Sequence, residues 1–301
     1  MFRPVAKRTL LFASFPLTIL SCDAQYRPVP RGWFAIWFAI LVFLVTTFNL
    51  ELCPAEAPSS AAIWRGQDMF EDPLFWVFVL PGLLLGLYAQ SRIKLNVTKY
   101  SQVETKDGIT GAEVARRLLD AQGLQNVAIE STPGILSDHY DPRSKTLRLS
   151  QQVYFAPSVA AAGIAAHEAG HALQDAEDYF PMEARTYIVP IVQIASQVAP
   201  WLFVVGLLLQ LETLTWVGVI LFGSSFLLAI LTLPVEFNAS ARAKELLIRY
   251  GIIRGDEQIA GVEKVLGAAA WTYVAAAVSA IGVWLFYLFV LFFRGSSAED
   301  H

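Results

Sequence analysis

The sequence predicts an α+β protein that is mainly helical, crosses a membrane several times and carries a small cytoplasmic domain of helices and a short β-sheet. Of its 301 residues, 55% are hydrophobic and the mean hydropathy is positive, which is high for a soluble domain. Several apolar runs are long enough to cross a bilayer, and a more polar region separates them. The net charge is −4, so the chain has no basic bias, and we expect no nucleic-acid partner. The two cysteines are too few for a disulfide framework.

The N-terminal part contains a predicted tail, a span and an external loop. Residues 1–32 contain an apolar run that is too short to cross a bilayer, so we expect a cytoplasmic tail. The alternatives are a signal-like segment or a lipoprotein cleavage site before Cys22. Residues 33–50 are apolar and long enough for a transmembrane span. Residues 51–74 are acidic and rich in turn formers, and they predict an external loop. Residues 75–90 predict a second span.

The main soluble region, residues 91–186, has the pattern of a helix, then short strands, then a helix. GITGAEVARRLLDAQGL predicts a helix capped by Thr110, with Glu113 at the spacing of a capping box. NVAIES, GILSDHYD and TLRLSQQVY predict three short strands, with a turn at 141–145 between the last two. The alanine-rich stretch 157–176 predicts the helix that follows.

The C-terminal part contains three further predicted spans. Residues 187–233 form two of them, joined by a very short turn. Residues 234–265 predict a soluble helical hairpin, with Pro234 in the first turn of a new helix. Residues 268–293 form the last span, and residues 294–301 a short tail.

Lysine and arginine concentrate in the two soluble regions, 91–186 and 234–265. By the positive-inside rule, both regions are cytoplasmic. The number of spans agrees, because the pair within 187–233 leaves the cytoplasmic side and returns to it. We therefore expect an integral multi-pass protein of a bacterial plasma membrane, with the lipid bilayer as a partner.

The stretch 157–176 contains the pattern His-Glu-x-x-His at His167, Glu168 and His171. Helix positions four apart share a face, so both imidazoles can bind one metal ion, and two neutral imidazoles suit Zn²⁺. Glu168 can act as a general base on a metal-bound water without ligating the metal. The alternative is a surface helix with two solvated histidines, which the small apolar neighbours disfavour.

The pattern lacks a third ligand, which a catalytic zinc usually has in addition to an open position. The other histidines are His139 and His301 and the cysteines lie far upstream, so we expect a carboxylate. Glu236 is preferred, because it directly follows a predicted span and would lie at the membrane surface. The alternative carboxylates are Asp175, Glu177, Asp178 and Glu183.

Five stretches of the chain, taken together, resemble those of a known family. They are LYAQSRIK (87–94), TGAEVARRLLD (110–120), SDHYDPRSKTLRLS (137–150), AAHEAGHALQDAEDY (165–179) and LPVEFNASARA (233–243). From about Leu80 to the end, the chain resembles the YugP-like family of membrane zinc metallopeptidases. The resemblance implies a zincin-like metallopeptidase domain and a zinc-dependent endopeptidase of the glutamate-ligand type. It implies the zinc ligands His167, His171 and Glu236 and the catalytic carboxylate Glu168.

The resemblance also indicates where this chain departs from related peptidases. In related glutamate-ligand peptidases, an aspartate four positions after the third ligand often orients a ligating histidine. Here that position is Ser240, whose hydroxyl can make the same bond more weakly than a carboxylate. The group that stabilises the oxyanion has four candidates, namely His139, Tyr179, Arg185 and Arg242.

The sequence therefore predicts a membrane-embedded zinc endopeptidase that acts on a peptide or a membrane protein. An edge strand of the small sheet could hold an extended peptide beside the metal. The alternative is a non-catalytic zinc-binding membrane adaptor or structural protein. A transporter is a weaker alternative, because the predicted spans contain few ionisable residues. No oligomeric state is predicted.

Overall fold

The computed structural model describes residues 73–105 and 107–294. The predicted tail at 1–32, the predicted span at 33–50 and the loop up to residue 72 lie outside the described residues, and so does the tail from residue 295. In the described part the chain is mostly helical and has a small three-stranded sheet, as the sequence predicts.

Four long helices dominate the described residues. They are α3 (Pro73–Tyr100), α7 (Phe180–Leu208), α8 (Glu212–Arg249) and α9 (Gly255–Phe289), and α9 continues into a short π-helix, η1 (Val290–Arg294). All four are long and apolar enough to cross a membrane. The spans predicted at 75–90, 187–233 and 268–293 fall on these helices.

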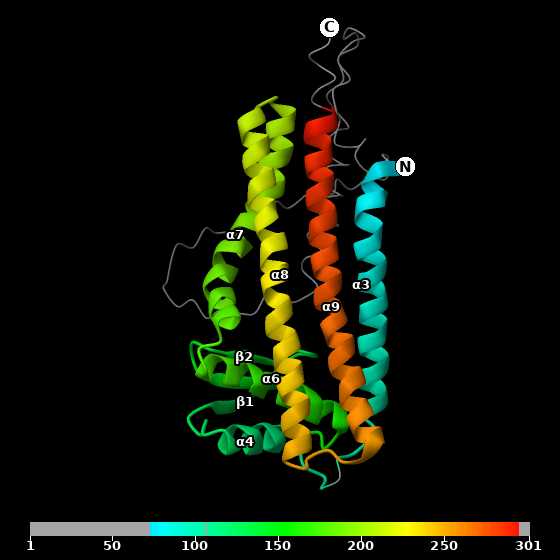
Figure 1. Cartoon of the computed structure of the whole chain (residues 1–301), viewed down its shortest axis with the longest axis vertical. Coiled ribbons are helices and arrows are strands. Elements are labelled where there is room, and N and C mark those ends of the chain that lie inside the picture. Colours follow the sequence, from blue (N-terminus) through cyan, green and yellow to red (C-terminus); the bar gives the residue numbers. More distant parts are fainter. Residues whose placement is uncertain (1–72, 106, 295–301) are drawn as a thin grey trace, which may run out of the picture. The chain divides into compact units, whose positions relative to one another are not determined.

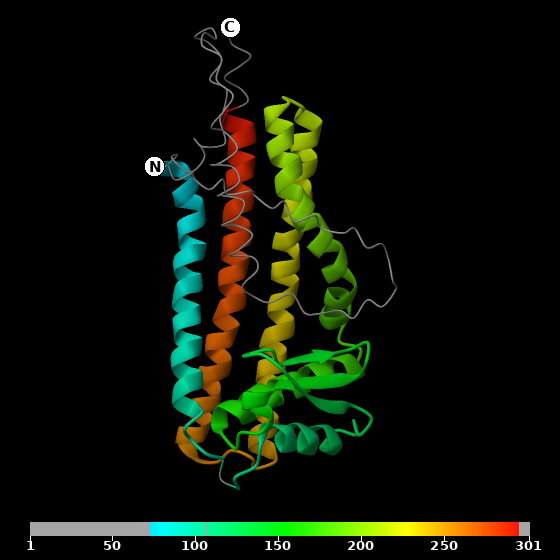
Figure 2. The same ribbon diagram turned by 180° about the vertical axis from the view of Figure 1, so that it is seen from behind.

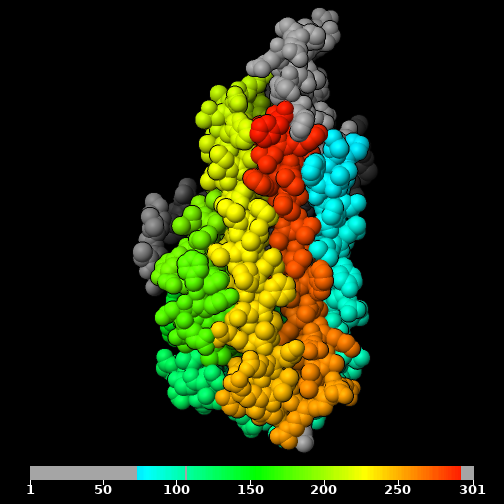
Figure 3. Space-filling view, viewed as in Figure 1, coloured from blue at the N-terminus to red at the C-terminus, as the bar shows by residue number. Residues whose placement is uncertain are grey.

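The long helices run side by side, and neighbours in sequence point in opposite directions (Figures 1 and 2). Helix α3 packs against α9, α7 against α8, and α8 against α9; Figure 3 shows α8 and α9 adjacent along one face. Glycines let α3 and α9 approach closely: a Cβ at Gly282 would collide with the carbonyl oxygen of Phe78. Without side chains at such points, the two backbones come into direct contact.

The remaining elements gather at the end of the bundle where α3 ends and α7 begins (Figure 1). They are α4 (Gly111–Ala121), β1 (Ala128–Thr132), β2 (His139–Asp141), β3 (Thr146–Ser150), α5 (Gln151–Tyr154) and α6 (Val159–Ala176). The strand order is β1-β3-β2, in which β1 is parallel to β3 and β2 antiparallel to it. Strand β2 therefore lies at an edge of the described sheet.

Helix α4 has the capping box that the sequence predicts. The Thr110 hydroxyl accepts a hydrogen bond from the backbone N–H of Glu113, and the Glu113 carboxylate accepts one from the backbone N–H of Thr110. The buried face of α4, which includes Val114 and Leu118, packs against α6. The cap thus fixes the start of a helix that covers one side of the core.

The third strand is shorter than the sequence suggests, because residues 151–154 form α5 instead. The last residue of β1, Thr132, pairs with Ser150, so beyond Ser150 the chain has no strand beside it to pair with. The carboxylate of Asp138 accepts a 2.8 Å hydrogen bond from the backbone N–H of Ser150 and fixes this end of the strand.

Two helices continue past the boundaries that the sequence suggests. Helix α3 extends beyond the apolar run to Tyr100, which is buried against Gly261 of α9. Helix α8 runs unbroken through Pro234, so the prediction of a new helix at that residue is wrong. A proline inside a helix costs about 3 kcal/mol, but α8 packs against α7 before Pro234 and against α6 after it. The predicted hairpin at 234–265 is therefore made of the ends of two long helices.

Candidate metal centre

Helix α6 carries the His-Glu-x-x-His pattern. The Ser158 hydroxyl caps its N-terminus by accepting a hydrogen bond from the backbone N–H of Ala161. Most of its residues are small and buried, so neighbouring elements pack close to its axis. His167 and His171 lie one turn apart on one face, and their ring centroids are 4.7 Å apart.

Helix α8 brings Glu236 to these two histidines. Its Oε2 is 3.2 Å from Nε2 of His167 and 3.7 Å from Nε2 of His171. One donor atom from each of the three residues lies within 4.8 Å of the others. Glu236 is 2% exposed and His171 is 6% exposed, so the group is almost closed off from solvent on the side of α8. The structure thus assembles, from two helices, the three residues that the sequence suggested as ligands.

The Nδ1 atom of each imidazole has its own partner. Nδ1 of His167 is 3.1 Å from the Ser240 hydroxyl, and Nδ1 of His171 is 2.9 Å from Oε1 of Gln174. Because an amide oxygen only accepts, Nδ1 of His171 carries a proton, and in the neutral ring Nε2 is then the nitrogen with the free lone pair. These contacts orient the rings so that both Nε2 atoms face Glu236.

Gln174 ties α6 to α8, and sequence reasoning missed it. It is fully buried, and its Nε2 donates hydrogen bonds to the backbone carbonyl of Val235 (2.8 Å) and to the side chain of Asn238 (2.9 Å). Its position three residues after His171 puts it on the same helical face, and that spacing was the signal that could have found it. Through Gln174, the position of the second histidine depends on the backbone next to Glu236.

The buried carboxylate of Glu236 has a cationic neighbour on α7. Nη1 of Arg185 is 2.9 Å from Oε1 of Glu236. A buried carboxylate without a partner is strongly disfavoured, so this ion pair compensates the charge of Glu236 from a third helix. Three helices therefore meet at this one carboxylate.

The edge strand β2 reaches the Glu168 carboxylate. The backbone N–H of Tyr140 donates a 3.1 Å hydrogen bond to Oε2 of Glu168, which is 8% exposed. The Tyr140 hydroxyl donates a 2.6 Å hydrogen bond to Asp175, which also pairs with Lys145. Burial, together with the hydrogen bond to Asp175, raises the pKa of Tyr140 above its ordinary value. The hydroxyl therefore remains protonated and keeps donating at neutral pH.

Close contact between α6 and α8 depends on Gly170. A Cβ at this position would lie 2.8 Å from the carbonyl oxygen of Ala239 and 3.2 Å from its Cα. Gly170 lies between Glu168 and His171, and Ala239 lies between Glu236 and Ser240. The absence of a side chain at this one position thus sets the separation of the helices that carry the group.

The alternative third ligands are not part of the three-residue group. Asp175 is engaged by Tyr140 and Lys145, and Glu177 pairs with Arg242 at 2.7 Å. The other two alternatives, Asp178 and Glu183, line a cavity beside the group.

Of the four residues considered for oxyanion stabilisation, Arg185 is the one that contacts the three-residue group. His139 places Nδ1 2.8 Å from the backbone carbonyl of Ser137. Arg242 contacts Glu177 and Asn238, and Tyr179 lines the neighbouring cavity.

The residues present fit a zinc ion. Two imidazoles and one carboxylate form a donor set that zinc accepts, and the contacts to Ser240 and Gln174 are those that metal-binding histidines make through their second nitrogen. The described residues add no fourth histidine, cysteine or carboxylate to the group. Three protein donors with a separate carboxylate beside them match a catalytic zinc site rather than a structural one.

Comparison with known proteins points in the same direction. A family model described as "Putative neutral zinc metallopeptidase" matches residues 75–293. The chain is 46% identical over 227 residues to the "Putative membrane protease YugP" of Bacillus subtilis (strain 168); the match covers 75% of this chain and all of that relative. No solved structure matches the chain. The matched region contains every residue of the three-residue group.

Proposed function

The chain belongs to the neutral zinc metallopeptidase family, and from this premise we propose that it is a membrane-bound, zinc-dependent endopeptidase. The observation that carries the proposal is the group formed by His167, His171 and Glu236, with the Glu168 carboxylate beside it. A site that kept zinc only for structure would normally have four protein ligands, whereas this group has three among the described residues.

We assign the zinc to the two histidines and Glu236. Zinc bound there would act as a Lewis acid toward a peptide carbonyl and toward the attacking water. Gln174 holds His171 in the tautomer that leaves Nε2 free for the metal, and the Ser240 hydroxyl holds the ring of His167 in place.

Glu168 is the proposed general base. Its carboxylate takes the proton of the attacking water and then delivers that proton to the nitrogen of the leaving amine. The hydrogen bond from the Tyr140 backbone holds one carboxylate oxygen at the edge of β2, beside the three-residue group. Arg185 is the proposed source of positive charge for the oxyanion, since its guanidinium already reaches Glu236.

The proposed substrate is a peptide segment or a membrane protein. The order β1-β3-β2 leaves β2 at a sheet edge, where an extended peptide can add as a further strand. The four apolar helices and the lysines and arginines of the soluble segments support a multi-pass plasma-membrane protein whose active site faces the cytoplasm.

The test combines metal content with hydrolysis. We expect detergent-purified wild type to hold about one zinc per chain and Glu236→Ala and His171→Ala to lose it. Glu168→Gln should keep its zinc while hydrolysis of a synthetic peptide library falls about 10²- to 10⁴-fold. Glu257→Gln, an exposed acid at the start of α9, serves as the control. Hydrolysis at the wild-type rate by Glu168→Gln would overturn the proposed mechanism, and an absence of zinc-dependent hydrolysis in the wild type would favour the adaptor.

A further inference from the structure

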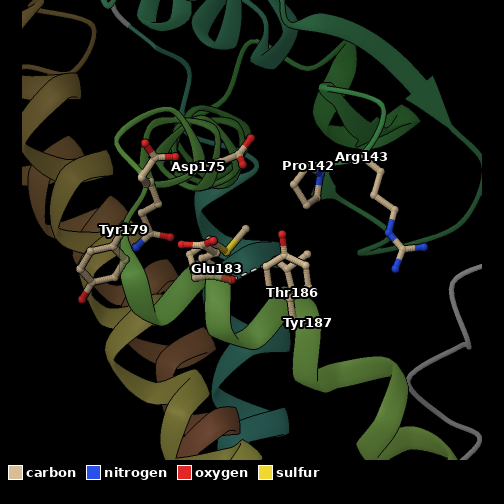
Figure 4. Close-up of a pocket in the computed structure, with 10 residues that line it drawn as sticks. Pro142, Arg143, Asp175, Tyr179, Glu183, Thr186 and Tyr187 are labelled. Atoms are coloured by element: carbon tan, nitrogen blue, oxygen red, sulfur yellow. Dashed lines mark hydrogen bonds between the residues drawn. The ribbon is translucent and has the colours of Figure 1, made fainter.

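A cavity of about 320 Å³ lies beside the proposed metal centre. Three parts of the chain enclose it: the turn after β2, the C-terminal end of α6, and the loop and first turns of α7 (Figure 4). Its volume is at the lower end of the range for ligand pockets, which suits one long side chain rather than a large ligand.

The cavity is connected to the metal centre through shared residues. Gln174 lines the cavity and also holds the ring of His171. Pro142 lines it from the turn that begins two residues after Tyr140, whose backbone contacts Glu168. The cavity therefore adjoins the end of the strand whose backbone contacts Glu168.

The lining combines apolar surface with carboxylates. Pro142, Met182 and Tyr187 supply apolar surface, and Asp175, Asp178 and Glu183 supply the carboxylates. Asp175 is neutralised by Lys145, whereas Asp178 and Glu183 have no ion-pair partner among the residues that the structure describes. The carboxylates of Asp178 and Glu183, near the metal centre, thus form no ion pair with any described residue.

One cation, Arg143, also lines the cavity. Figure 4 shows its guanidinium on the far side of Pro142 from Asp175, directed away from Glu183. Its charge therefore lies at the rim of the cavity, and the part bounded by α6 and α7 is acidic.

We infer that this cavity is a substrate subsite that takes a lysine or arginine side chain of the peptide being cleaved. The inference rests on the proposed peptidase function. Lysine and arginine have an apolar stem that suits the walls and a cationic end that pairs with Asp178 and Glu183. Membrane proteins concentrate these two residues in the cytoplasmic segments that flank their spans, and the cavity lies where the membrane-length helix α7 begins.

The two acids also have a purely structural explanation, since negative charge near the start of α7 complements the helix dipole. In that case their removal would lower stability without changing which peptides are cleaved. Asparagine readily adopts the positive φ of 51° found at Asp178, so Asp178→Asn preserves the backbone. The side chain of Glu183 is exposed, so Glu183→Gln should fold as well.

The experiment maps cleavage sites in a synthetic peptide library randomised at eight positions, using the full-length zinc-loaded protein in detergent and sequencing the products by mass spectrometry. We expect lysine and arginine to be enriched about tenfold at one fixed position from the cleaved bond, the effect of one charge-assisted hydrogen bond. The double variant Asp178→Asn/Glu183→Gln should remove this enrichment. The single variant Glu183→Lys should instead enrich aspartate and glutamate at that position. Asp256→Asn with Glu257→Gln, which neutralises two exposed acids of α9, should leave it unchanged.

Each outcome has one meaning. A wild type that cleaves without preference for lysine or arginine, or a preference that survives in both cavity variants, would overturn the subsite and leave the peptidase function standing. Library cleavage that does not depend on Glu168 would instead overturn the proposed function, and the subsite with it. A lower thermal midpoint with unchanged preference would assign the two acids to the helix dipole alone.

Discussion

Tyr140 contacts the centre through both its backbone and its side chain: its backbone N–H donates to Oε2 of Glu168 at 3.1 Å, and its hydroxyl donates to Asp175 at 2.6 Å. Glu168 and Asp175 lie on α6, two turns apart. The edge strand is thus attached to α6 at two points, and a shift of either element moves the proposed base relative to a peptide on the strand.

Tyr140→Phe removes the second attachment and keeps the first. We expect kcat for peptide hydrolysis to fall about three- to tenfold, the effect of one hydrogen bond, with KM and zinc content unchanged. The control is Tyr250→Phe, which removes a hydroxyl that accepts a 3.0 Å hydrogen bond from Gln122 away from the centre. Steady-state kinetics with equal kcat values for the two variants would show that the hydroxyl does not position Glu168.

Arg185→Met leaves the buried Glu236 without its arginine partner. In zinc-free protein we expect the free energy of unfolding to fall by about 2–3 kcal/mol, which is at or below the lower end of the range for breaking a fully buried pair, because the Arg185 side chain is 28% exposed. Added zinc should reduce the loss, because the metal then neutralises Glu236. The measurement is denaturant unfolding in detergent with a chelator or with zinc. Lys244→Met, which breaks an exposed pair with Glu263, should cost under about 1 kcal/mol in both conditions.

Gln174→Leu and Ser240→Ala test the partners of the two imidazoles. Each should weaken zinc binding about 10- to 100-fold, as loss of such partners does in other zinc sites. Gln174→Leu should also destabilise the protein, because it removes the two hydrogen bonds that the buried Gln174 amide donates to the Val235 carbonyl and to Asn238. Competition with a chelator of known affinity measures the effect, with Gln125→Leu on the exposed surface as the control. Wild-type affinity in both variants would argue against zinc at these histidines.

Gly170→Ala should force α6 and α8 apart. The new Cβ would meet the Ala239 backbone at 2.8 Å, so we expect a loss of about 1–3 kcal/mol in stability and weaker zinc binding. Gly163→Ala is the matched control on the same helix: its Cβ would lie 3.6 Å from the side chain of Val262, an ordinary contact, and alanine favours helix. Thermal unfolding and zinc titration should therefore show lower stability and weaker zinc binding for Gly170→Ala, and neither loss for Gly163→Ala. Equal behaviour would mean that the spacing of the helices does not depend on Gly170.

Much of this architecture could be predicted from the chain because the signals were local. Apolar runs marked the four long helices of the described part, Thr110 with Glu113 marked the start of α4, and the histidine spacing placed both imidazoles on one face. Glu236 is the preferred third ligand because it directly follows an apolar run. The structure brings it to the two histidines, although Pro234 begins no new helix.

The remaining features depend on tertiary contacts that no local pattern encodes. Helix α8 continues through Pro234 because two other helices hold it, and α3 continues to Tyr100 because α9 offers Gly261 as a packing surface. Tyr140 could not be linked to Glu168 in advance, because the two residues are brought together by the way the small sheet packs on α6. The sequence does not distinguish Arg185 from the other three oxyanion candidates, because its contact with Glu236 depends on the packing of α7 beside α8.

The unbroken course of α8 decides which fragments of this protein can be studied. Glu236 lies on the same continuous helix as a membrane-length apolar stretch, and Arg185 lies on a second such helix. A truncation to the sheet and α6, residues 101–179, would be convenient to express without detergent, but it would lack both the third donor and its counter-charge. The proposed metal centre therefore cannot be separated from the membrane-length helices, and inhibitor screening and biochemical reconstitution require a chain that contains α7 and α8.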